Sequence, residues 1–136
     1  MKDEAAAVVV AKKFIGYSQG PLKDWTSTDQ RHLRHIVPEE PRRAYNMRAV
    51  IESLADTDSV LELRPNFGIG MITALVRIAG QPIAIIANNP AHLAGAIDAE
   101  ATDKAARFSD LAETLRLPLL TLCDTPGCMV GPDAET

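Results

Sequence analysis

The stretch from Val60 to Gly131 decides the fold, and it reads VLELRPNFGIGMITALVRIAGQPIAIIANNPAHLAGAIDAEATDKAARFSDLAETLRLPLLTLCDTPGCMVG. Its apolar runs follow the order strand, strand, helix, strand, and the connections between them are rich in Gly, Pro and Asn. Two loops, residues 88–95 and residues 124–127, each follow the C-terminal end of an apolar run. Open α/β sheets usually bind ligands at such ends. The stretch therefore predicts an α/β fold with a candidate ligand site at these two loops.

Three strands and a hairpin are predicted in the first half of this stretch. Residues 60–64 alternate apolar and polar side chains, which is typical of a short strand. Residues 71–78 and 83–87 are two further strands, joined at Ala79-Gly80-Gln81-Pro82, a sequence that favours a hairpin. The run 83–87 is apolar throughout, as expected for a strand buried on both faces.

A helix over residues 98–116 and a buried strand over residues 119–123 complete a ββα plan. Asp98 is the expected N-cap of this helix. Its core face is predicted from apolar residues spaced four, three, four and three apart: Ala101, Ala105, Phe108, Ala112 and Leu115. Earlier in the chain, residues 46–55 predict another helix with Asn46 as its N-cap.

The first 43 residues predict a helix and an ordered linker. The helix covers residues 3–19, with Val8, Ala11 and Ile15 on its buried face and Lys12 and Lys13 toward solvent. One short helix cannot bury its own apolar face, so we expect it to be the last helix of a preceding unit. Residues 22–43 have little periodicity, and they carry apolar side chains that could lie on a partner surface: Trp25, Leu33, Ile36 and Val37.

Composition narrows the classes of protein and of partner. The 136 residues suffice for one core, aromatic residues make up only 4% of the chain, and the net charge is −4. No basic patch follows any predicted element, which argues against a nucleic-acid partner. No apolar run approaches the roughly 20 residues of a membrane span, and the N-terminus does not resemble a signal peptide. Two cysteines form no disulfide framework, so we expect a reducing, cytoplasmic location.

Side-chain chemistry is weakly indicated. Asp124-Thr125-Pro126-Gly127 matches a DxxG motif of GTPases, but the chain has no GxxxxGK[ST] phosphate loop, and a tight turn is the alternative interpretation. Cys123 is expected in the core. The cysteines and the histidines (His32, His35 and His92) have no metal-ligand spacing, so we predict no metal site.

The loop over residues 88–96 differs, because it leaves a buried strand and leads into the capped helix. Its small residues let a ligand approach the backbone, where N–H groups can stabilise an oxyanion without a catalytic side chain. An ordinary strand-to-helix connection is the alternative interpretation.

Nine segments carry a resemblance to a known family. They are LELRPNFG at 61–68, MIT at 71–73, RIAGQP at 77–82, ANNP at 87–90, LAGAID at 93–98, DKAARF at 103–108, LPL at 117–119, DTPG at 124–127 and YNMRAVI at 45–51. With these segments the chain closely resembles the carboxyltransferase subunit of biotin-dependent acyl-CoA carboxylases. The resemblance implies a partial crotonase-like ββα superhelix. It also implies a boundary: residues 1–43 end the first half of such a subunit and residues 44–136 open the second.

The resemblance implies transfer of a carboxyl group from carboxybiotin to the α-carbon of an acyl-CoA. The partners it implies are an acyl-CoA, a biotin carboxyl carrier that bears the biotin, a biotin carboxylase and further copies of the subunit. Candidate biotin-pocket residues lie in the two loops: Asn88, Asn89, Pro90, Gly95, Ala96, Asp124, Thr125, Pro126 and Gly127. A biotin-dependent acyl-CoA decarboxylase component and a non-catalytic binding or assembly module are the alternatives. Many relatives carry an aromatic residue and then Leu-Pro-Gly after DTPG, whereas this chain has Cys128-Met129-Val130-Gly131.

Overall fold

A four-stranded mixed sheet forms the centre of the computed structural model, which describes residues 4–38, 40 and 45–131. Its strands are β1 (Leu61–Leu63), β2 (Met71–Ile78), β3 (Gln81–Asn88) and β4 (Leu119–Leu122), in the order β1-β2-β3-β4. The first two pairings are antiparallel and β3 pairs with β4 in parallel. The expected α/β fold with a ββα order is confirmed. No helix within the described ranges is long and apolar enough to cross a membrane.

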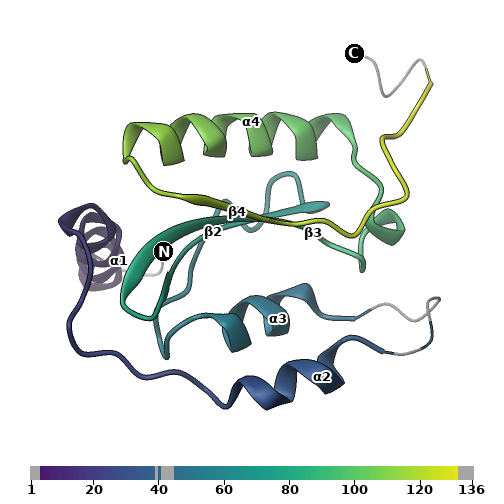
Figure 1. The fold of residues 1–136 in the computed structure, drawn as a ribbon. Helices are drawn as coiled ribbons and strands as arrows, with labels where there is room; N and C mark the ends of the chain where they lie inside the picture. The colour runs from purple at the N-terminus through teal and green to yellow at the C-terminus, as the bar shows by residue number, and fades with distance from the viewer. Residues whose placement is uncertain (1–3, 39, 41–44, 132–136) are drawn as a thin grey trace.

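Helices cover both faces of the sheet (Figure 1). Helix α4 (Ala99–Thr114) lies on one face, and α3 (Met47–Leu54) with the short α2 (Leu33–Ile36) lies on the other. Both predicted N-caps are confirmed: Asn46 Oδ1 accepts a hydrogen bond from Arg48 N at 3.0 Å, and Asp98 Oδ1 accepts one from Ala101 N at 2.8 Å. These bonds satisfy backbone donors that a helix end otherwise leaves without partners.

The β2–β3 hairpin turns through only two residues, Ala79 and Gly80, whose φ angles are +52° and +77°. Two positive φ angles are what a tight hairpin turn requires. Strand β3 consequently starts at Gln81 rather than at the expected residue 83. Pro82 fits because it lies opposite Arg77, next to the hydrogen-bonded pair that closes the turn, where its missing N–H would point away from β2.

Alternate side chains of β2 and β3 point to opposite faces of the sheet and pack into two separate cores. The core against α3 contains Met47, Ile51, Ala55, Ile72, Ala74, Val76, Ile85 and Ala87. The core against α4 contains Tyr17, Leu75, Ala84, Phe108 and Ala112. The expectation that β3 is buried on both faces is therefore confirmed, and so is the predicted core face of α4, with Phe108 and Ala112 in its centre.

The predicted packing of the first helix was wrong. Helix α1 (Glu4–Gly16) continues into a 3-10 turn, η1 (Tyr17–Gln19), so its extent agrees with the expectation. However, Val8 and Ile15 are about half exposed, and Phe14 and Tyr17 make the core contacts instead. Residues 5–11 are an unbroken run of Ala and Val, so apolar periodicity could not select one face. Lys13, predicted toward solvent, donates hydrogen bonds to the carbonyls of Asp58 and Val60 at 2.7 and 2.8 Å.

The linker and the last strand also differ from expectation. Residues 22–38 are ordered as predicted, but they include η2 (Gln30–His32) and α2, while residues 39 and 41–43 lie outside the described part. Trp25 stays half exposed. Strand β4 was expected to be buried, yet only alternate residues are partly buried, and Cys123 is exposed rather than in the core. The reason is that β4 forms the edge of the sheet among the described strands.

Candidate functional site

The two predicted loops meet because β3 and β4 run in parallel. Ala87 pairs with Leu122, so the loops that follow these strands leave the same edge of the sheet. Segments more than 30 residues apart in sequence thus become neighbours. The structure brings the two loops together at one edge of the sheet, whereas their role in binding remains a prediction.

Asn88 links the loops through its side chain. This residue is only 5% exposed, at the end of β3. Its Oδ1 accepts a hydrogen bond from Asp124 N at 3.2 Å, and its Nδ2 donates to Gly95 O at 3.5 Å. A buried side-chain amide needs a partner for its oxygen and another for its nitrogen, and here the two partners belong to different loops. Asn88 therefore holds the two loops together. The sequence predicted it only as a residue that lines the pocket.

Gly95 allows the loops to touch. Its φ is +84°, and a Cβ built on it would lie 2.6 Å from Asp124 O. Leu93 and Ala94 before it also have positive φ, at +46° and +52°, so the chain reverses sharply here. A side chain at position 95 would push the loops apart, since a Cβ that close to a backbone oxygen must move.

Backbone hydrogen bonds extend the contact between the loops. Ile97 N donates to Gly127 O at 3.0 Å, and Met129 N donates to Ile97 O at 2.8 Å. Within the turn, Gly127 N donates to Thr125 Oγ1 at 3.0 Å. The Asp124–Gly127 segment is therefore a tight turn stabilised by its own side chain and joined to the first loop.

Asn89, Pro90 and Ala96 complete the first loop. Asn89 ties it to the β1–β2 connection, since its N donates to Gly70 O at 2.9 Å and its Nδ2 donates to Ile69 O at 2.8 Å. Pro90 is partly buried, and Ala96 is buried. The loop is thus held on both sides, by residues 69–70 and by residues 124–129.

Two polar residues near the site were missed from the sequence. Tyr45 Oη donates a hydrogen bond to Asp124 Oδ2 at 2.7 Å, and partial burial together with this carboxylate raises the pKa of Tyr45 to about 12. His92 Nε2 lies 3.2 Å from Asp98 Oδ2, which links the loop to the N-terminus of α4. No local pattern indicates the Tyr45–Asp124 contact, because the two residues are 79 positions apart and their contact depends on the packing of α3.

Lys104 was also missed, although it lies within the predicted core face of α4. It is 2% exposed, and its Nζ donates to Met71 O at 2.7 Å and more weakly to Gly68 O at 3.5 Å. Burial lowers the pKa of this amine. Because a buried ammonium needs acceptors, Lys104 fastens residues 68–71 to α4. A charged residue is usually expected at the surface. Only its position between the predicted core residues Ala101 and Ala105 could have indicated that Lys104 is buried.

The side chains of Asp124, His92 and Asp98 contact other groups of the protein, and the donors left for a ligand are backbone groups. Within residues 45–131, no acceptor receives the N–H groups of Leu93 and Ala94. No group of three His, Cys, Asp or Glu side chains that could hold a metal occurs in the described part of the chain. The site can therefore offer close backbone approach and peptide donors to a ligand.

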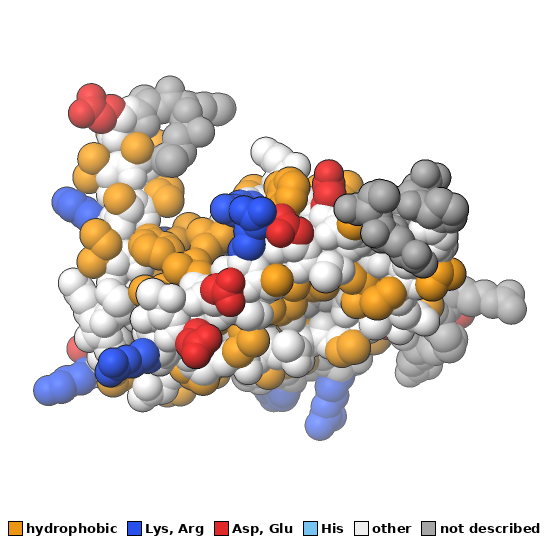
Figure 2. All heavy atoms as spheres, turned by 90° about the horizontal axis from the view of Figure 1, so that it is seen from above, with side chains coloured by type: hydrophobic (Ala, Val, Ile, Leu, Met, Phe, Trp, Pro, Cys, Tyr) orange, Lys and Arg blue, Asp and Glu red, His pale blue; other side chains and the backbone are white. Residues whose placement is uncertain are grey.

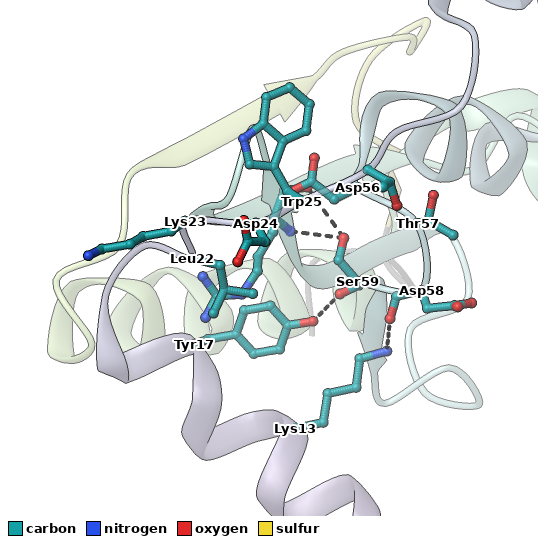
Figure 3. A pocket seen from close by; sticks show the side chains of 12 residues that line it. Lys13, Tyr17, Leu22, Lys23, Asp24, Trp25, Asp56, Thr57, Asp58 and Ser59 are labelled. Carbon is teal, nitrogen blue, oxygen red and sulfur yellow. Dashed lines mark hydrogen bonds between the residues drawn. The ribbon is translucent and has the colours of Figure 1, made fainter.

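A cavity of about 560 Å³ lies at the opposite end of the sheet, beside the hairpin turn (Figure 3). Its polar lining atoms hold the structure together: Tyr17 Oη donates to Ser59 O, Lys13 donates to Asp58 O, and the Asp56 carboxylate accepts from Gly80 N at 2.7 Å. The Arg77 guanidinium donates to backbone carbonyls of residues 16, 20 and 80. We therefore infer that these groups stabilise the fold, because their hydrogen bonds join α1, the linker and the hairpin.

Comparison with known proteins identifies the family. The family model described as the carboxyl transferase domain matches residues 3–136. The chain is 34% identical over 116 residues to the biotin-dependent acetyl-/propionyl-coenzyme A carboxylase beta5 subunit of Mycobacterium tuberculosis (strain CDC 1551 / Oshkosh), covering 85% of this chain and 21% of that protein. It is 30% identical over 142 residues to the methylmalonyl-CoA carboxyltransferase 12S subunit of Propionibacterium freudenreichii subsp. shermanii, covering 98% of this chain and 27% of that protein.

Solved structures agree. A single-chain, multi-domain long-chain acyl-CoA carboxylase matches with a TM-score of 0.95 and 55% identity, over 98% of this chain and 14% of that one. The transcarboxylase 12S structure with hydrolysed methylmalonyl-coenzyme A matches with a TM-score of 0.86 and 31% identity, over 98% and 28%. The chain thus spans only about a fifth to a quarter of the two curated relatives named above. The matched family model and these relatives show that the chain belongs to the carboxyl transferase domain family and has its crotonase-like mixed α/β fold.

Proposed function

We propose that the chain is part of a carboxyltransferase that moves a carboxyl group from carboxybiotin to the α-carbon of an acyl-CoA. Membership of the carboxyl transferase domain family supports the reaction class. The observation that carries the proposal to this chain is the joining of the two loops through Asn88, Gly95 and Asp124. Their junction forms a fixed wall at the sheet edge where α/β folds usually bind ligands.

The chemistry on offer fits a biotin donor. Carboxybiotin would supply an activated carboxyl group, and negative charge would develop on the ureido oxygen as that group leaves. Preorganised N–H groups stabilise such charge without accepting a proton. Leu93 and Ala94 provide N–H groups that no acceptor among the described residues uses, and Gly127 adds no side chain that would hinder approach. We therefore place the biotin side of the pocket at residues 88–96 and 124–127.

The acyl group that we favour is a long chain. The long-chain acyl-CoA carboxylase shares 55% identity with this chain, compared with 30–34% for the two curated relatives with short-chain names. We also propose a biotin on a carrier domain and a biotin carboxylase as further partners, because the curated carboxylase subunit named above is biotin-dependent. Exposed apolar side chains on α1, including Val8, Val9 and Ile15, support self-association. Figure 2 shows hydrophobic side chains (orange) along this helix, at the left of the view.

The proposed boundary between the two carboxyltransferase halves stays at residues 43 and 44. Both cysteines are free thiols, which supports a reducing, cytoplasmic compartment. By itself, the 136-residue chain should show no carboxyl transfer, because the chemistry needs two oxyanion sites facing one cavity and the two loops provide one wall. Losing one oxyanion donor typically costs about 100- to 1,000-fold in kcat.

A chimera tests the proposal. Residues 1–136 replace the matching segment of the long-chain acyl-CoA carboxylase, and acyl-CoA-dependent carboxylation is measured with a long-chain and a short-chain acyl-CoA. We expect activity within about tenfold of the parent and a preference for the long chain. A folded chimera without activity would contradict the proposed reaction, and a preference for acetyl-CoA or propionyl-CoA would contradict the acyl group. The isolated chain is the matched negative control.

A further inference from the structure

Three residues from two separate segments contact Asp124. Its carboxylate accepts a hydrogen bond from Tyr45 Oη at 2.7 Å, and its backbone N–H donates to Asn88 Oδ1 at 3.2 Å. Its carbonyl oxygen faces the α-carbon of Gly95 at a distance that excludes any side chain there. Asn88 and Gly95 belong to the first loop, whereas Tyr45 comes from the opposite side of the sheet, just before α3.

Tyr45 is itself firmly placed. Its ring packs against the core that α3 shares with the sheet, and the next residue, Asn46, caps α3. The Tyr45 ring is therefore held by packing, whereas the side chain of Asp124 is exposed and its carboxylate accepts the Tyr45 hydrogen bond. Figure 1 shows that the chain enters α3 on the side of the molecule toward which it leaves β4.

We propose that Tyr45 is a positioning residue of the candidate site, which acts through the carboxylate of Asp124 to fix the Asp124–Gly127 turn against the first loop. This inference rests on the proposed carboxyl transfer for its kinetic consequences. Tyr45 touches neither substrate nor cofactor in this account. It sets the orientation of the turn, and a misplacement of about 1 Å in such a wall can cost up to 100-fold in rate.

The first test measures hydrogen exchange in the 136-residue chain, so it does not depend on activity. Tyr45→Phe removes only the hydroxyl. We expect faster exchange in a peptide covering residues 119–131, because the turn loses its hydrogen bond to Tyr45, and unchanged exchange in β2. Tyr17→Phe is the matched control, because Tyr17 also donates a hydroxyl hydrogen bond, to Ser59 O, at the other end of the sheet. Equal exchange of residues 119–131 in wild type and Tyr45→Phe would overturn the proposal.

The second test uses the chimera described above. We expect Tyr45→Phe to lower kcat by about fivefold to tenfold, within the range for one typical lost hydrogen bond, with KM for the acyl-CoA within twofold. Tyr17→Phe should leave kcat unchanged. In an Asp124→Ala background, Tyr45→Phe should have no further effect, since Tyr45 would have lost the group through which it acts.

The outcomes separate the two proposals. An inactive parent chimera together with faster exchange at residues 119–131 refutes the proposed reaction but supports Tyr45 as the residue that fixes the turn. An active chimera whose kcat Tyr45→Phe does not change refutes the positioning role and leaves the reaction supported. Additive effects of Tyr45→Phe and Asp124→Ala would also overturn the inference, because they would show that Tyr45 acts by another route.

Discussion

Lys104 offers a sharp test of how α4 is attached to the sheet. Its amine is buried and donates to the carbonyl of Met71, which begins β2. Lys104→Ala removes three buried methylenes, worth about 0.8 kcal/mol each. It also removes a hydrogen bond from a charged donor, worth about 1.5–3 kcal/mol. Relief from burying a charge offsets part of this loss, so we expect a net destabilisation of about 2–4 kcal/mol.

Lys104→Met separates the stem from the charge. Methionine fills a similar volume, so it keeps most of the packing and removes the amine. We expect it to cost about 0–2 kcal/mol, because the lost hydrogen bond and the removed desolvation oppose each other. The free energy of unfolding is measured by urea denaturation at pH 7, with fluorescence and circular dichroism followed together to check two-state behaviour. If Lys104→Ala lies within about 0.5 kcal/mol of wild type, half the usual effect of a substitution, the assigned burial is wrong.

The pH dependence of stability, compared between wild type and Lys104→Met, is a second test of the buried amine. Burial lowers the pKa of Lys104 in the folded protein, so in the unfolded chain the amine keeps its proton to higher pH. Between the two pKa values the unfolded state binds more protons, and the wild type gains stability as pH rises toward about 10.4, the ordinary value for lysine. Lys104→Met lacks this gain. The stability difference between wild type and Lys104→Met should therefore grow in favour of wild type from pH 7 to pH 10, and a flat difference would contradict the buried amine.

Three further predictions concern the core, the loop contact and a buried phenol. Phe108→Ala should cost about 3–5 kcal/mol, the range for a buried aromatic, and an unchanged urea midpoint would show that Phe108 is not core. Gly95→Ala should cost about 2–4 kcal/mol, because it combines positive φ with a 2.6 Å approach to Asp124 O, whereas Gly16→Ala, with open space around it, should be neutral by the same urea assay. Burial raises the pKa of Tyr17 to about 12, so the folded state binds more protons above pH 10 and stability should fall between pH 10 and 12. Tyr17→Phe should fall less steeply over that range, and equal slopes would argue against the buried phenol.

Local patterns predicted the elements with strong periodicity. The hairpin, the capped helix α4 and the apolar strand β3 each depend on interactions between near neighbours, and the sequence spacing records those interactions directly. The meeting of the loops after β3 and β4 was also accessible, because a strand–helix–strand connection favours parallel neighbours whose C-terminal ends share one edge.

Contacts between distant segments could not be predicted in the same way. Helix α1 is apolar on several sides, so the face that it buries is chosen by the sheet and by the carbonyls that receive Lys13. Cys123 looked like a core residue because its neighbours are apolar, yet β4 is an edge strand among the described elements. Lys104 looked like a surface residue because it is charged, and only the carbonyls of residues 68 and 71 explain its burial.

The candidate site depends on the same helix that Lys104 anchors. Strand β4 reaches β3 only after the chain has crossed the sheet through α4, so the loops meet only when α4 is packed. Asp98 serves both structures, because it caps α4 and contacts His92 of the first loop. Once α4 is packed, the hydrogen bonds of Asn88 hold Gly95 and Asp124 next to each other. A site built from backbone groups needs such support, since peptide donors stabilise charge only when they are held in place before the reaction. This dependence explains why several residues that shape the loops lie in the core around them.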